Sequence, residues 1–153
     1  MTEGVVEYVH VAPEEGADPQ RVDSADAVAR RGLRGDRYFR DEGTFADRSG
    51  SDLTLIEAEA LDAVEADYGI ALDPGVHRRN VTTRGVALNH LVGQTFLVGA
   101  VRCRGTELCE PCSYLEQHLA AEGVREALVH RGGLRATILE GGTIEPGDRV
   151  RIE

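Results

Sequence analysis

The sequence has 153 residues, of which 41% are hydrophobic, and this length and composition are typical of one compact domain spanning residues 1–153. Its 27 acidic and 17 basic residues give a formal net charge of −10, so we expect no binding to nucleic acid or to anionic membranes. Every base is arginine, and the lack of lysine excludes an internal Schiff base with pyridoxal phosphate or a carbonyl substrate.

The first half of the sequence predicts two strands and a helix. The alternating segment VVEYVHVAP predicts an opening strand, and residues 14–24 are expected to form a loop. A short apolar run at 53–56 predicts a second strand. A helix is predicted over 57–69, because its apolar residues recur at near-helical spacing and Gly69 ends the pattern.

The second half predicts short strands separated by glycines. The β-prone runs are NVTT, TFLVG, AVRCRG, LRATILE and RVRIE. The segment GGTIEPGD at 141–148 is expected to be a turn. Because short strands with turn signals between them favour a barrel, the predicted fold class is mainly β, a barrel with a few short helices.

A further helix is predicted just after a pair of cysteines, Cys109 and Cys112. Ser113 lies three residues before Glu116, which is a capping-box pattern, and Gly123 ends the segment. Cys112 therefore lies just before the first turn of this predicted helix.

The expected compartment is the cytoplasm. The N-terminus has neither the basic start nor the apolar core of a signal peptide, and no stretch approaches the roughly 20 apolar residues of a membrane span. Three cysteines in such a chain predict reduced thiols instead of a disulfide framework.

The cysteine pair leaves three interpretations open. A redox couple resembles the thioredoxin motif, but the parallel strand–helix–strand unit of that motif is not predicted here. A zinc set would combine Cys103, Cys109, Cys112 and His118, although zinc knuckles usually show two closely spaced ligand pairs. In the third interpretation Cys112 is one working thiol, Cys109 is a bystander or a resolving thiol, and Cys103 is a small buried hydrophobe.

Several motifs occur in the order and spacing of a known family. They are GLRGDRYF at 32–39, LTLIEAEAL at 53–61, HRRNVTTRGVALNHLVGQTFLVGAVRCRG at 77–105, CEPCSYLE at 109–116 and RGGLRATILEGGTIEPGDRVRI at 131–152. Together they resemble the MOSC domain, named for the C-terminal domain of molybdenum-cofactor sulfurase. The resemblance implies a mainly β barrel like the β-barrel domain of pyruvate kinase.

The resemblance also implies that Cys112 is the family's reactive cysteine, acting as catalytic residue and as metal ligand. Family members bind the molybdenum-pterin cofactor or carry sulfur, and some reduce N-hydroxylated compounds. Both roles need a thiolate, and the free amides and dipole of a helix N-terminus would lower the pKa of this thiol. Because the chain has no desulfurase or ferredoxin-like segment, we expect a separate sulfur donor, such as a cysteine desulfurase, or an electron-transfer protein as partner.

Arginines and glycines are the expected ligands of the pterin phosphate. A planar guanidinium can bind a phosphate bidentately, glycine lets backbone amides approach it, and an asparagine can bond the pterin edge. The cofactor-binding candidates are Arg34, Gly35, Asp36, Arg37, Arg79, Asn80 and Arg131. The sequence departs from the family at Tyr38, where a histidine is usual. The alternative function is a non-catalytic zinc- or metal-binding regulatory barrel.

Overall fold

A computed structural model describes residues 3–13, 19–36, 39, 52–69, 79–109 and 132–153. These residues form mostly β-strands. In chain order the elements are β1 (Glu3–Val11), β2 (Gln20–Val22), β3 (Ala25–Val28), β4 (Gly32–Leu33), β5 (Leu53–Glu57), α1 (Ala58–Tyr68), β6 (Val81–Arg84), the 3₁₀ helix η2 (Leu88–Leu91), β7 (Thr95–Val98), β8 (Val101–Leu108), β9 (Leu134–Glu140), β10 (Gly142–Ile144) and β11 (Arg149–Ile152).

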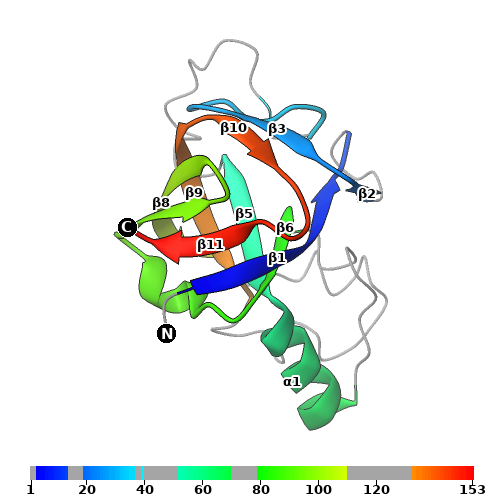
Figure 1. The fold of residues 1–153 in the computed structure, drawn as a ribbon. Helices are drawn as coiled ribbons and strands as arrows, with labels where there is room; N and C mark the ends of the chain where they lie inside the picture. The colour runs from blue at the N-terminus through cyan, green and yellow to red at the C-terminus, as the bar shows by residue number, and fades with distance from the viewer. Residues whose placement is uncertain (1–2, 14–18, 37–38, 40–51, 70–78, 110–131) are drawn as a thin grey trace.

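Seven strands of the described part of the chain close into a barrel (Figure 1). Each pairs with the next in the order β1, β11, β7, β8, β9, β5 and β6, and β6 pairs with β1 to complete the ring. All these pairs are antiparallel except β5 with β6, and β2 adds a strand beside β1. The predicted mainly β barrel is confirmed, and its closure pairs the first strand with the last.

The barrel interior is filled by alternate residues of each strand. In β8, Val101 and Cys103 are fully buried, whereas Arg102 and Arg104 between and after them are not. The strand β9 repeats this alternation. Because successive side chains of a strand point to opposite faces, these period-2 segments place one set of apolar residues in a common core. Full burial of one large side chain such as Phe96 contributes about 1.5–3 kcal/mol to stability.

The predicted helix over 57–69 is confirmed as α1. Gly69 follows its last turn with a φ of 67°, and the Gly69 N–H donates a hydrogen bond to the Glu65 carbonyl. Glycine adopts this left-handed backbone without a side-chain penalty, so it ends the helix. Ala58, Ala60 and Val64 are buried. In Figure 1 the helix continues from the end of β5 and extends away from the barrel.

Two short strands lie inside segments that the sequence predicted to be a loop and a turn. β2 lies inside the predicted loop at 14–24 and pairs with β1, with Val22 beside Val9. β10 lies inside the predicted turn at 141–148 and pairs with β3 in a separate three-stranded sheet of order β10, β3, β4. Both predictions are wrong at these residues. Three residues carry too little alternation to be recognised, and the partner strand supplies the hydrogen bonds that make each a strand.

No helix in the described ranges is both long and apolar enough to cross a membrane.

Candidate functional site

Five predicted site residues are among those that the structure describes. They are Arg34, Gly35, Asp36, Arg79 and Asn80. Cys112, Arg37 and Arg131 lie outside the described residues, as does the helix predicted after Cys112. The described candidates come from the turn that follows β4 and from the two residues that precede β6, and hydrogen bonds connect both segments to the end of β1.

Asn80 lies just before β6, and its side chain joins three strands. The residue is 1% exposed. Its Oδ1 accepts hydrogen bonds from the backbone N–H and the hydroxyl of Thr54, both at 3.1 Å, and its Nδ2 donates to the His10 carbonyl at 3.2 Å. The His10 N–H in turn donates to the Asn80 carbonyl at 2.7 Å. These contacts make Asn80 a positioning residue that holds the start of β6 between β1 and β5.

Arg79 connects the start of β6 to the ends of β8 and β9. Its Nε donates to the Gly132 carbonyl at 2.8 Å, and its Nη2 donates to the Cys109 carbonyl at 3.1 Å. The Cys109 N–H donates to the Gly133 carbonyl at 2.8 Å. One guanidinium therefore lies against the last described residue before segment 110–131 and the first described residue after it. Its charge is permanent at neutral pH.

The turn at 34–36 is attached to the end of β1. Gly35 has a φ of 86°, and the Asp36 carboxylate accepts a hydrogen bond from the Ala12 N–H at 2.9 Å. Asp36 is 5% exposed, and its carbonyl accepts a hydrogen bond from the Phe39 N–H at 3.0 Å. The Asp36 side chain thus positions the turn beside Ala12, two residues from the His10 carbonyl that Asn80 contacts.

Three further residues of this region were not among the sequence candidates. Asp52 is 1% exposed, and its carboxylate accepts a hydrogen bond from the Ile138 N–H at 3.0 Å. Thr54 is the partner of Asn80, and a Cβ added to Gly133 would lie 2.1 Å from the Leu55 carbonyl oxygen. A polar residue before an apolar strand and the pair of glycines at 132–133 were the available signals. Neither reveals its partner, because the partners are distant in the sequence.

Cys103 is a fully buried thiol in the interior of the barrel. Burial raises the pKa of Cys103 to about 12, and the nearby charge of Asp52 adds to the effect. The thiol therefore stays protonated, and the prediction of a small buried hydrophobe is confirmed. A zinc ligand must be a thiolate, so this burial disfavours Cys103 as a member of the zinc set. Within the described ranges no three His, Cys, Asp or Glu side chains are grouped to hold a metal ion.

His10, whose backbone bonds to Asn80, has a buried imidazole. Burial lowers the pKa of His10, and the charge of Arg21 lowers it further. The ring centroid of His10 lies 6.2 Å from that of Tyr8. The guanidinium carbon of Arg21 lies 4.5 Å from the same Tyr8 centroid. The imidazole is therefore mainly neutral at pH 7, and the positive charge of this region comes from arginines.

Two surface hollows, of about 350 and 190 Å³, lie away from the predicted site residues. Both are lined by Arg84, whose guanidinium pairs with Glu7 at 2.5 Å and with Asp62 at 3.2 Å. Because these carboxylates already neutralise Arg84, the hollows have no excess positive charge from it to attract an anion.

Of the described candidates, Arg34 and Gly35 are open to an anionic group such as a phosphate, whereas the side chains of Asp36, Arg79 and Asn80 bond to the protein's own backbone. Arg34 is exposed, and no atom lies within 4 Å of the position that a Cβ of Gly35 would occupy. This open space beside a left-handed glycine lets the oxygens of a ligand approach the backbone, and guanidinium groups favour phosphate geometry. The residues therefore suit the phosphate end of a pterin cofactor, whereas the predicted metal ligand, Cys112, lies outside the described residues.

Comparison with known proteins agrees with this fold. The MOSC domain model matches residues 23–151. Among solved structures, the YuaD protein from Bacillus subtilis superposes with a TM-score of 0.83 at 14% identity, covering 98% of this chain and 95% of that one. YiiM from Geobacillus stearothermophilus gives a TM-score of 0.75 at 16% identity, with 99% and 75% covered. YiiM from Escherichia coli gives 0.70 at 15% identity, with 97% and 69% covered. None of the curated proteins matches the sequence significantly.

Proposed function

Because the chain belongs to the MOSC domain family, whose function is associated with the molybdenum cofactor, we propose that it binds a molybdenum-pterin cofactor and uses Cys112 as its reactive thiol. The exposed guanidinium of Arg34 and the open backbone at Gly35 receive the phosphate, together with Arg37 and Arg131. Asp36 and Asn80 position these elements through their buried hydrogen bonds. The cofactor, when bound, would supply the metal for reduction of an N-hydroxylated compound, with the electrons coming from a separate electron-transfer protein.

The observation that supports this proposal most is the placement of Arg79. Its guanidinium donates a hydrogen bond to the Cys109 carbonyl, and Cys112 follows Cys109 by three residues in the sequence. The proposal therefore puts the Cys112 thiol within the influence of the positive charge of Arg79. A nearby cation favours the thiolate form of a cysteine. The same charge serves a thiolate that binds metal and a thiolate that accepts sulfur from a donor protein.

The test is native mass spectrometry, with elemental analysis, of protein made in cells that synthesise the cofactor and purified without oxygen or reductant. We expect the mass of a molybdenum-pterin group, with stoichiometric molybdenum. The Cys112→Ala variant should lose the metal, and Arg79→Gln should retain less cofactor. Cys109→Ala and Arg104→Gln are the matched controls, because the described hydrogen bonds of Cys109 are made by its backbone and the Arg104 side chain is exposed.

Three other outcomes of this experiment would favour an alternative function or contradict the proposal. One extra sulfur atom that is lost in Cys112→Ala would identify a sulfur carrier instead of a resident cofactor site. Stoichiometric zinc that is lost in the same variant would favour the regulatory metal-binding barrel. Bare protein from cofactor-producing cells would contradict both the cofactor and the carrier proposals.

A further inference from the structure

Three neighbouring strands of the barrel, β11, β7 and β8, direct arginines to the solvent. The barrel core is filled by their alternate residues Phe96, Val98, Val101, Cys103 and Val150. Because successive side chains of a strand point to opposite faces, the residues between these lie on the outer face of the barrel. We call this surface the arginine face, after its four arginines Arg102, Arg104, Arg149 and Arg151.

The arginine face is locally positive in an acidic protein. Its three strands contain four arginines and one acidic residue, whereas the formal net charge of the chain is −10. Two of the four arginines pair with carboxylates at the margin of the face. Arg102 contacts Glu140 and Glu153, both at 2.5 Å, and Arg149 pairs with Glu3. The other two arginines supply the unpaired charge.

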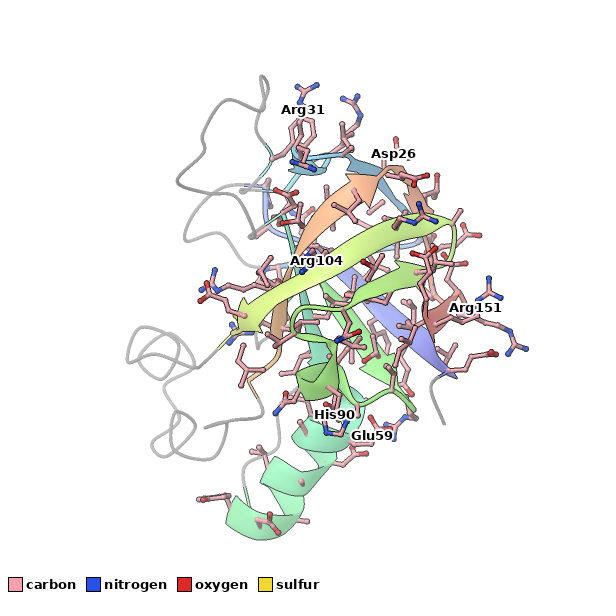
Figure 2. The ribbon with its side chains drawn as sticks, turned by 90° about the vertical axis from the view of Figure 1, so that its left-hand side faces the viewer. Asp26, Arg31, Glu59, His90, Arg104 and Arg151 are labelled. Atoms are coloured by element: carbon pink, nitrogen blue, oxygen red, sulfur yellow. The ribbon has the colours of Figure 1, made fainter. Side chains whose placement is uncertain are left out.

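Arg104 and Arg151 are these unpaired cations. Both are exposed, and in the part of the chain that the structure describes neither side chain has an ion pair, a hydrogen bond or a ring contact. Figure 2 shows Arg104 on β8 and Arg151 at the right-hand side of the barrel. A guanidinium carries five N–H donors in a planar fork, so each of these two can bind a carboxylate of another molecule.

The strand register places the two cations on either side of β7. Arg151 lies opposite Leu97, and Arg104 lies opposite Thr95. From the usual spacing between and along strands, the Cα atoms of the two arginines are roughly 12 Å apart. Leu97 and Thr95 are partly exposed between them. A small, partly apolar centre with arginines on both sides has the composition of a protein-docking surface, because arginine is enriched in such surfaces.

The amount and spacing of this charge favour an acidic protein over other anions. Neither of the two surface hollows beside Arg84 is lined by Arg104 or Arg151. Nucleic acids and anionic membranes are bound by larger basic clusters, and a chain with a net charge of −10 repels such extended polyanions. An acidic protein surface instead presents separate carboxylates, which can pair with the two arginines one at a time.

We infer that the arginine face docks the acidic surface of a partner protein, and that this partner is the electron-transfer protein that the proposed reduction needs. The docking rests on the charge and register of the strands, whereas the role of the partner rests on the proposed function. The strand β8 connects the two places, because it carries Arg104 and ends next to Cys109, whose carbonyl accepts a hydrogen bond from Arg79. Complementary charges of this kind speed association and are screened by salt.

Fluorescence anisotropy with labelled poly-L-glutamate, a model of an acidic protein surface, measures the docking to the whole chain. We expect wild-type protein to bind at low salt and to bind more weakly as salt is added. Arg104→Gln and Arg151→Gln should each weaken binding by about twofold, and the double variant by about fivefold or more. Arg21→Gln is the matched control, because it removes one exposed positive charge from β2, outside the arginine face.

Unchanged affinity in the double variant would overturn the inference, as would an equal loss in Arg21→Gln or a wild-type protein that does not bind. Tighter binding of a labelled DNA duplex, lost in the same double variant, would assign the face to nucleic acid and overturn the protein partner. Circular dichroism checks the fold of each variant, and the two single variants replace the double variant if that unfolds.

A second measurement separates this inference from the proposed function. Cofactor-loaded protein receives electrons either from reduced methyl viologen, a small donor that needs no docking face, or from an acidic ferredoxin. The double variant should reduce an N-hydroxylated compound normally with viologen but show a raised KM for ferredoxin, and an unchanged KM would overturn the role of the partner. No reduction with viologen would contradict the proposed function and that role, whereas poly-L-glutamate binding, which Cys112→Ala should retain, would still decide the docking face.

Discussion

Buried polar side chains of the candidate site act on the backbone of other segments. The Asp36 carboxylate binds the Ala12 N–H, the Asp52 carboxylate binds the Ile138 N–H, and Asn80 binds the Thr54 N–H. Each is nearly inaccessible to solvent. Removal of one partner leaves a buried donor unsatisfied, which costs about 1–3 kcal/mol. At the residue scale these side chains therefore determine where the arginines of the site lie.

Asn80→Ala should lower the free energy of unfolding by about 2–3 kcal/mol, because Thr54 loses an acceptor and the His10 carbonyl loses a donor. Urea denaturation measures this loss. Asn89→Ala, at an exposed asparagine in η2, should change stability by less than about 0.5 kcal/mol. Equal effects of the two substitutions would contradict the structural role of Asn80.

Glu57, which precedes α1, should make one part of the stability depend on pH. Burial raises the pKa of its carboxyl, the hydrogen bond from the Leu88 N–H opposes that shift, Glu59 raises the pKa further and His90 lowers it. A carboxyl with a higher pKa in the folded state stabilises the fold fully below its unfolded value, near 4.5, and this contribution is lost as pH rises through the folded value. Glu57→Gln keeps an acceptor without the charge, so it should be at least as stable as wild type at pH 7.

The difference in unfolding free energy between Glu57→Gln and wild type, measured in urea from pH 4 to pH 8, tests this sign. The difference should shift in favour of the variant as pH rises. Glu65→Gln, at an exposed glutamate of α1, is the matched control. A difference that is constant with pH would disprove a raised pKa at Glu57.

At the scale of elements, backbones approach one another where only glycine fits. A Cβ at Gly105 in β8 would lie 2.1 Å from the Leu91 carbonyl oxygen of η2, and one at Gly133 would lie 2.1 Å from the Leu55 carbonyl oxygen of β5. Gly133 also neighbours Arg79 and the Cys109 N–H. These contacts bring the beginning of β9 against β5 and so place Gly132 and Cys109 within hydrogen-bond distance of Arg79.

Gly133→Ala should destabilise the fold by more than the roughly 1–2 kcal/mol that a left-handed backbone costs a residue with a side chain, since its φ is 117° and its Cβ meets backbone atoms. Gly147→Ala is the matched control, because its φ is 95° but no atom lies within 4 Å of the added Cβ. Thermal unfolding of both variants separates the two effects. A smaller loss in Gly133→Ala than in Gly147→Ala would show that the contact with Leu55 relaxes easily.

At the scale of the whole molecule, the barrel is closed by the two ends of the chain. β1 pairs with β11 through Glu3–Arg151, Gly4–Val150 and Val5–Arg149, and β11 also pairs with β7. Val6 and Val150, on these two strands, are both part of the central core. An open barrel would expose this core and two unpaired strand edges, which promote aggregation.

Deletion of residues 149–153 should therefore abolish cooperative unfolding and cause aggregation. Size-exclusion chromatography and a thermal unfolding curve measure these effects. Arg149→Ala is the control, because it removes only the exposed ion pair with Glu3, and we expect a loss of less than about 1 kcal/mol. A deleted protein that stays monomeric with a sharp transition would show that β11 is not required for closure.

Local patterns in the sequence determined the barrel class, most of its strands, the end of α1 at Gly69 and the burial of Cys103. These features follow from alternation, helical spacing and glycine, which act within a few residues. The short strands β2 and β10, the contact of Arg79 with Cys109 and Gly132, and the placement of Arg31 and Arg34 on Phe39 were decided only by the tertiary structure. Strand pairing brings distant segments together, and no local pattern records which partner a side chain will meet.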